Sequence, residues 1–147
     1  MLPLRRAAWT LAVLAAACTA TPSTRRAVPA RLEPEARRAA MELAATYQRA
    51  QAEDFFSLVD QSLFPDFSSF QHRVRQFLLH NRSLNIDLII DTVVVSEGRA
   101  AVSARWNKAF VDPNGRPQKD NGECEFLLKQ RPSGGLALID IQGDSPF

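Results

Sequence analysis

The chain has 147 residues, 46% of them hydrophobic and 23% charged, with 18 Lys and Arg against 16 Asp and Glu. This length fits a single domain, and the apolar fraction is too high for a disordered chain. The net charge of +2 comes entirely from Arg5 and Arg6, and from residue 39 onward 11 basic residues stand against 14 acidic ones. A nucleic-acid-binding protein is therefore not indicated.

Residues 1–17 have the pattern of a secretory signal peptide. Arg5 and Arg6 precede an uncharged run of eleven residues, 7–17, which ends in small residues. A basic segment, an apolar segment and a small-residue cleavage site follow one another in such signals. Eleven helical residues span about 16 Å, roughly half the hydrocarbon core of a bilayer. We therefore expect an exported chain without a permanent membrane span.

The signal ends in Leu-Ala-Ala-Ala-Cys, residues 14–18, which resembles the lipobox of bacterial lipoproteins. The resemblance implies that Cys18 is lipidated, and Thr19 after it implies the periplasmic face of the outer membrane. Ala15 stands where the lipobox favours leucine. Ordinary cleavage with secretion to the periplasm is therefore the alternative.

A tether and one folded domain are predicted after the signal. Residues 18–32 are rich in Pro, Thr and small residues and have no apolar periodicity, as in a lipidated tether. The domain then spans residues 33–147. Its first half repeats apolar residues at helical spacing. This predicts three helices, over residues 33–50, 53–62 and 67–81.

A period of two replaces the helical period after residue 83, which predicts strands. In the first strand, Leu84, Ile86, Leu88, Ile90 and Val94 are expected to share the apolar face. The apolar face of the sheet and those of the helices must cover each other. We therefore predict an α+β roll, with three N-terminal helices on a curved antiparallel sheet. Its four strands are expected over residues 84–95, 99–111, 118–129 and 136–142.

This order of elements resembles the nuclear transport factor 2-like superfamily, which includes ketosteroid-isomerase-like proteins. The resemblance implies a cone whose mouth opens between the sheet and the helices. The superfamily contains isomerases, dehydratases, small-ligand binders and accessory subunits. The sequence shows no short strand between the first and third helices, which many members have. The features that carry the resemblance are Tyr47-Gln48-Arg49-Ala50 before Asp54-Phe55-Phe56, the strand 86–95, residues 103–108 and the final strand 136–141.

The candidate pocket consists of residues that the apolar faces direct into the cone. An isomerase would need a carboxylate base and an oxyanion donor there. Tyr47 is either this donor or a core residue, and the acidic residues Asp87, Asp91, Glu123 and Glu125 are predicted on the opposite face. The predicted pocket residues are Tyr47, Phe56, Phe70, Trp106, Lys108, Phe110 and Phe126.

Lys108 is the most unusual member of this set, because an unpaired buried charge is unfavourable. It is expected either to extend out at the mouth or to meet an acidic ligand or carboxylate. His72 and His80 lack the spacing of a zinc site, and Cys124 is expected to be a buried, unreactive thiol. If Cys18 is not lipidated, a Cys18–Cys124 disulfide becomes conceivable. We predict no catalytic residues, metal or cofactor.

These observations predict a non-catalytic lipoprotein of the cell envelope. It would be attached to the membrane through Cys18, and its cone would bind a protein partner or a small apolar ligand. The charged outer sheet face favours a monomer or a weak homodimer. The alternative is a ketosteroid-isomerase-like or dehydratase-like enzyme that acts on a small hydrophobic substrate through Tyr47 and an acidic residue.

Overall fold

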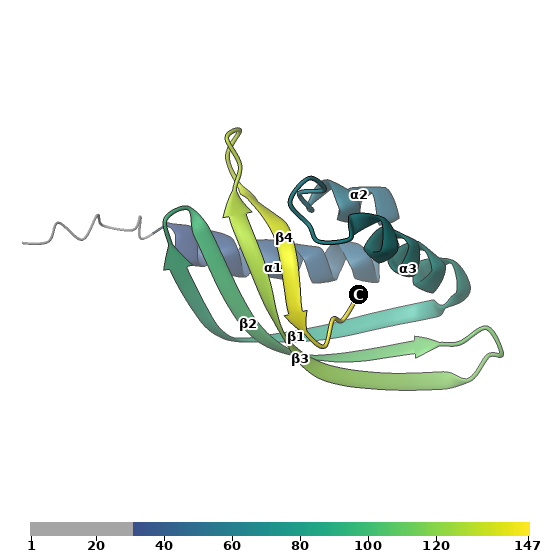
Figure 1. The fold of residues 1–147 in the computed structure, drawn as a ribbon. Helices are drawn as coiled ribbons and strands as arrows, with labels where there is room; N and C mark the ends of the chain where they lie inside the picture. The colour runs from purple at the N-terminus through teal and green to yellow at the C-terminus, as the bar shows by residue number, and fades with distance from the viewer. Residues whose placement is uncertain (1–30) are drawn as a thin grey trace, which may run out of the picture.

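Three helices precede four strands in the computed structural model, which describes residues 31–147. The strands form one antiparallel sheet in the order β1-β2-β3-β4. Figure 1 shows a curved sheet with α1 running across it and with α2 and α3 gathered at one end. The predicted α+β class is confirmed. The elements are α1 (Leu32–Gln48), α2 (Ala52–Ser57), α3 (Phe67–His80), β1 (Arg82–Ser96), β2 (Arg99–Val111), β3 (Pro117–Gln130) and β4 (Leu136–Gly143).

The predicted signal peptide, Cys18 and all but the end of the tether lie outside the described residues. Among residues 31–147, no helix is both long and apolar enough to cross a membrane.

Small residues let α1 lie close to the sheet. Its alanines at positions 36, 40 and 44 are buried, and the helix contacts mainly β1 and β2. Glu33 and Glu35 in its first turn complement the positive end of the helix dipole. The buried positions recur every three or four residues, so that one face meets the core. They are Leu32, Ala36, Ala40, Leu43, Ala44, Thr46 and Tyr47.

The predicted second helix, 53–62, is wrong in its second half. α2 ends at Ser57 because the residues after it pair with β4. The Leu138 amide donates to the Leu58 carbonyl at 2.9 Å, and the Asp60 amide donates to the Leu138 carbonyl at 2.8 Å. These bonds satisfy main-chain groups that a longer helix would otherwise pair internally. An isolated parallel bridge therefore lies where the sequence shows no strand pattern.

The prediction that Val94 shares the apolar face of β1 is also wrong. β1 pairs Ile90 with Ala104 but Thr92 with Ser103, which leaves Asp91 as an extra residue. An extra residue of this kind, a β-bulge, reverses the alternation of the side chains after it. Val94 is consequently 64% exposed. Its neighbours Val93 and Val95 pack against the core instead.

The inner faces of β2 and β3 supply most of the core below the helices. Along β2, buried Trp106 and Lys108 alternate with exposed Arg105 and Asn107, as the period of two predicts. The sheet therefore presents one inward face to the helices and one outward face that carries most of the strand charges.

Candidate binding site

Residues 144–147, here called the tail segment, follow β4 and turn into the space between the sheet and the helices, here called the cone. The turn occurs at Gly143, whose φ of +84° suits glycine. A Cβ atom on Gly143 would lie 2.7 Å from the Glu123 carbonyl oxygen. The Asp144 amide donates to that same oxygen at 2.9 Å. Figure 1 shows the end of the tail segment between α3 and the sheet.

The Phe147 ring occupies the middle of an aromatic cluster inside the cone. Its centroid lies 4.8 Å from that of Phe55, 4.9 Å from that of Tyr47 and 5.8 Å from that of Phe126. These separations are typical of favourable aromatic pairs. Pro146, the residue before it, is fully buried. The tail segment thus fills space that helices and sheet leave between them.

Two side chains of β2 hold the main chain of the tail segment. The Trp106 indole Nε1 donates to the Asp144 carbonyl at 2.8 Å, and the Lys108 Nζ donates to the Pro146 carbonyl at 3.0 Å. Gly122 lies opposite Trp106 on β3. A Cβ atom on Gly122 would approach both Trp106 Cζ2 and Asp144 Cβ to 2.7 Å. The absence of a side chain at this position makes room for the tail segment.

Lys108 does not extend into solvent as one expectation had it, and among residues 31–147 no carboxylate forms an ion pair with it. It is 7% exposed. Its Nζ lies 4.5 Å from the Phe77 ring centroid, 5.4 Å from that of Trp106 and 5.9 Å from that of Phe110. Aromatic faces attract a cation, and the tail-segment carbonyl accepts its hydrogen bond. Burial lowers the pKa of Lys108, against a smaller opposing effect of the Asp120 charge.

Tyr47 is fully buried beside the Phe147 ring, and its hydroxyl has no hydrogen-bond partner among the described residues. Burial also raises the pKa of this phenol. A buried hydroxyl without a partner costs about 1–3 kcal/mol. The isomerase alternative would need a carboxylate base in the cone. No carboxylate of residues 31–147 lies within hydrogen-bonding distance of the Tyr47 hydroxyl.

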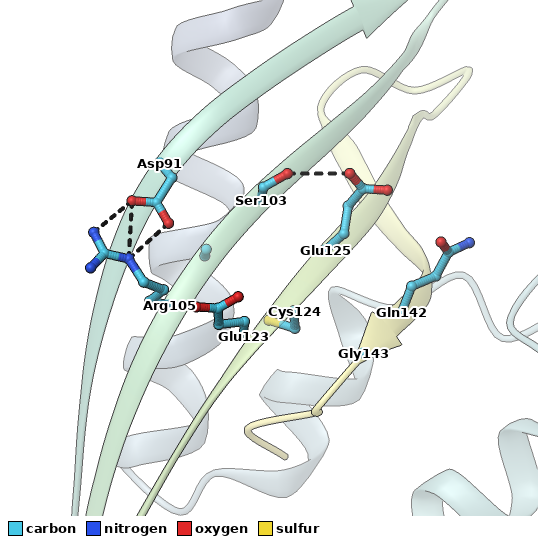
Figure 2. Close-up of a pocket in the computed structure, with 9 residues that line it drawn as sticks. Asp91, Ser103, Arg105, Glu123, Cys124, Glu125, Gln142 and Gly143 are labelled. Atoms are coloured by element: carbon cyan, nitrogen blue, oxygen red, sulfur yellow. Dashed lines mark hydrogen bonds and ion pairs between the residues drawn. The ribbon is translucent and has the colours of Figure 1, made fainter.

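The four acidic residues predicted to point away from the cone, Asp87, Asp91, Glu123 and Glu125, lie on the outer sheet face, whereas Asp120 of β3 stands opposite Lys108. Figure 2 shows Asp91 paired with Arg105 and Ser103 bonded to Glu125, beside Glu123. The closest Arg105–Asp91 contact is 2.7 Å, and the Ser103 hydroxyl donates to Glu125 at 3.2 Å. The bond from Arg105 lowers the pKa of Asp91. These side chains line an open hollow of about 370 Å³, across the sheet from Tyr47.

The predicted pocket residues fall into two groups. Tyr47, Trp106, Lys108 and Phe126 surround the tail segment, and Phe110 lies beside Lys108. The remaining two, Phe56 and Phe70, pack against the Phe55 ring, which itself lies against the Phe147 ring.

Phe56 and Phe70 pack among the helices, because α2 and α3 cover each other there. The Phe56 ring meets Phe67 and the Arg75 guanidinium, and the Phe70 ring stacks on Phe64 at 4.4 Å. This cluster packs α2 against α3 and meets the tail-segment site through Phe55.

Three aromatic residues of the site were not predicted as pocket residues. Phe77 lies on the apolar face of the third helix, and Phe55 lies next to a predicted pocket residue. Both therefore carried a signal in helical periodicity. Phe147 carried none, because it follows the last strand without any periodic pattern.

The remaining candidate groups lie away from the tail segment or are unreactive. Burial, aided by the Asp144 charge, raises the pKa of Cys124 to about 12, which fits a structural thiol. His72 and His80 are exposed on α3. Within residues 31–147, no three His, Cys, Asp or Glu side chains are grouped so that they could hold a metal ion.

Solved structures share this architecture at low sequence identity. A ketosteroid isomerase-like protein from Erwinia carotovora atroseptica aligns with a TM-score of 0.67 at 14% identity, over 80% of this chain and 99% of that one. The fold is the nuclear transport factor 2-like cone. A protein from Streptomyces avermitilis, assigned as a dehydratase of the nuclear transport factor 2-like family, aligns with a TM-score of 0.66 at 13% identity, over 78% and 96% of the two chains.

A third structure, a nuclear transport factor 2-like superfamily protein from Salmonella enterica, has a TM-score of 0.63 at 14% identity and covers 78% of this chain and 90% of that one. No family model and no curated protein sequence matches the chain. At these identities the likeness shows the nuclear transport factor 2-like fold alone. The function must therefore be argued from the side chains in the cone.

Proposed function

We propose that this chain is a non-catalytic binding domain, held by a lipid on Cys18 at the periplasmic face of the outer membrane. Its cone takes an apolar group of a protein partner or of a small ligand. One observation above all supports binding: the cone already accommodates an apolar group, the Phe147 ring, and two side-chain donors hold the main chain beside it. An apolar pocket with a few directed polar groups is the usual form of a ligand site.

The enzyme alternative receives less support from the described residues. A ketosteroid-isomerase-like or dehydratase-like reaction needs an acid–base pair in the cone. The Tyr47 hydroxyl has no such partner. Two of the strand carboxylates, Asp91 and Glu125, are engaged by Arg105 and Ser103 on the outer face. We therefore favour binding over catalysis.

Binding in the cone is testable with the amphiphilic aromatic probe 1-anilinonaphthalene-8-sulfonate. The probe is titrated into the ¹⁵N-labelled Cys18→Ser chain and followed by two-dimensional NMR. We expect saturable shifts of the Trp106 indole Nε1–H and of the tail-segment amides, because the probe must enter beside them. Saturable shifts confined to Val94 and Leu127, which line an apolar hollow on the outer face, would contradict a site in the cone.

The lipid anchor has a prediction of its own. Cys18→Ser is expected to move the chain from the membrane fraction to the soluble fraction, because each buried CH₂ of an acyl chain contributes about 0.8 kcal/mol. Fractionation of cells and incorporation of labelled palmitate measure this. Cys124→Ser is the matched control and should remain with the membrane, since Cys124 is buried in the domain. Membrane association that survives Cys18→Ser would exclude the anchor.

A further inference from the structure

The tail segment is held in the way that proteins hold a bound peptide. Two of its main-chain carbonyls, those of Asp144 and Pro146, accept hydrogen bonds from side chains, Trp106 and Lys108, rather than from a neighbouring strand. Such bonds read the peptide backbone and therefore do not depend on which side chains the peptide carries. Both donors lie on the inner face of β2 at alternate positions, so that they match two carbonyls at the same spacing.

Selectivity at this site comes from the last two positions of the tail segment. Pro146 is fully buried, and proline has no N–H that would be left unpaired in an apolar site. The Phe147 ring packs against the rings of Tyr47, Phe55 and Phe126. A segment with proline followed by an aromatic residue therefore matches the apolar contacts that the tail segment makes here.

The site is also shaped for this occupant. Gly122 leaves the space that Asp144 and Trp106 occupy, since a Cβ atom there would approach both to 2.7 Å. Gly143 directs the chain from the edge of the sheet into the cone. In addition, the Tyr47 hydroxyl is fully buried beside the ring and has no partner among the described residues. The present occupant thus leaves one polar group of the site unused.

We propose that this cradle is a peptide-binding site that residues 144–147 occupy in cis, and that an extended proline-aromatic segment of a partner protein takes their place. The inference rests on the proposed binding function and names the chemistry of its partner. The unused Tyr47 hydroxyl is then available to an acceptor that the partner segment carries and the tail segment lacks.

Competition with the tail segment of the same chain determines how tightly the site binds a partner segment. A segment attached directly to β4 has a high effective concentration at the site. A partner segment binds only the fraction of molecules whose tail segment has left, so its apparent affinity falls by that fraction. Weakening the tail segment should therefore strengthen binding in trans without any change to the walls of the site.

The experiment measures binding of the amidated peptide acetyl-Asp-Ser-Pro-Phe by calorimetry. It uses the full chain as Cys18→Ser and as Cys18→Ser with Phe147→Ala. We expect the Phe147→Ala chain to bind the peptide at least tenfold more tightly than the parent. It should also prefer this peptide at least tenfold over acetyl-Asp-Ser-Pro-Ala. Phe147→Leu keeps an apolar side chain in the cone, should give an intermediate affinity, and serves in place of Phe147→Ala if that chain does not fold.

Three outcomes would overturn the inference. The first is equal affinity of the parent and the variants, which would mean that the tail segment does not compete. The second is no peptide binding by a folded variant. If the sulfonate probe still shifts Trp106 in that case, the proposed binding function stands and only the peptide partner is excluded. The third is a concentration-dependent dimer of the parent that the peptide dissociates, because the partner would then be the tail segment of a second copy.

Discussion

Replacing Phe126 with alanine is expected to lower the free energy of unfolding by about 3–5 kcal/mol, as for other large aromatic residues in protein cores. Phe126 is fully buried, pairs with Val102 across the sheet and stacks on the Phe147 ring. Its removal leaves a cavity below the tail segment as well as lost contacts. A loss of this size is a large part of the roughly 5–15 kcal/mol that stabilises a typical domain. Urea unfolding followed by circular dichroism measures it.

The neighbouring residue provides the control for this prediction. Leu127 is on the same strand but points to the outer face, where it lines a partly open hollow. Leu127→Ala should therefore lose clearly less stability than Phe126→Ala. Equal losses would show that the inward and outward faces of β3 are assigned incorrectly.

Replacing Gly122 with alanine is expected to expel the tail segment from the cone. The new Cβ atom would approach Asp144 Cβ and Trp106 Cζ2 to 2.7 Å, which is closer than real Cβ contacts. Overpacking of this kind typically costs about 1–3 kcal/mol. Trp106 would lose its bond to the Asp144 carbonyl and gain water, so its fluorescence should shift to longer wavelength. Hydrogen exchange of the amides of residues 144–147 should accelerate.

Asn121→Ala is the matched control, because Asn121 is the exposed neighbour on the same strand. It should leave both the fluorescence and the exchange rates unchanged. If Gly122→Ala also left them unchanged, the tail segment would not pack against Gly122 in solution.

Much of the fold could be predicted because its signals are local. The bounds of β2, residues 99–111, match the prediction, since strict alternation runs between two strong turns. In the second turn, the Asp112 carboxylate accepts bonds from the Asn114 and Arg116 amides, and Gly115 has a φ of +75°. A turn of this kind depends on residues next to one another, so the sequence alone indicates it.

The two errors in the fold have a shared physical origin. The end of α2 at Ser57 and the bulge at Asp91 are both decided by pairing with another strand, β4 in one case and β2 in the other. Periodicity within a single segment does not contain this information. The prediction from periodicity therefore made the second helix too long, and it continued the alternation of β1 unchanged beyond Asp91.

The sequence indicated the β2 side chains that surround the candidate site, but it did not indicate that the tail segment fills this site. Alternation along β2 placed Trp106 and Lys108 on the inner face of the sheet, and both are buried there. Their partners lie 38 residues further along the chain, in a segment too short to show any pattern. For Lys108, the sequence indicated that a buried charge needs compensation. It did not indicate that a main-chain carbonyl and three aromatic rings would supply it.

The extra residue at Asp91 lets the two halves of β1 follow opposite alternations along one strand. In a strand without a bulge, even-numbered and odd-numbered side chains point to opposite faces along the whole strand. In β1 the two sets exchange faces at Asp91. Deleting Asp91 would join Ile90 directly to Thr92 and restore simple alternation, with Val93 and Val95 still facing the core and Val94 still facing solvent. Loss of this one residue would therefore remove the Asp91–Arg105 ion pair but leave the core-facing side chains of β1 in place.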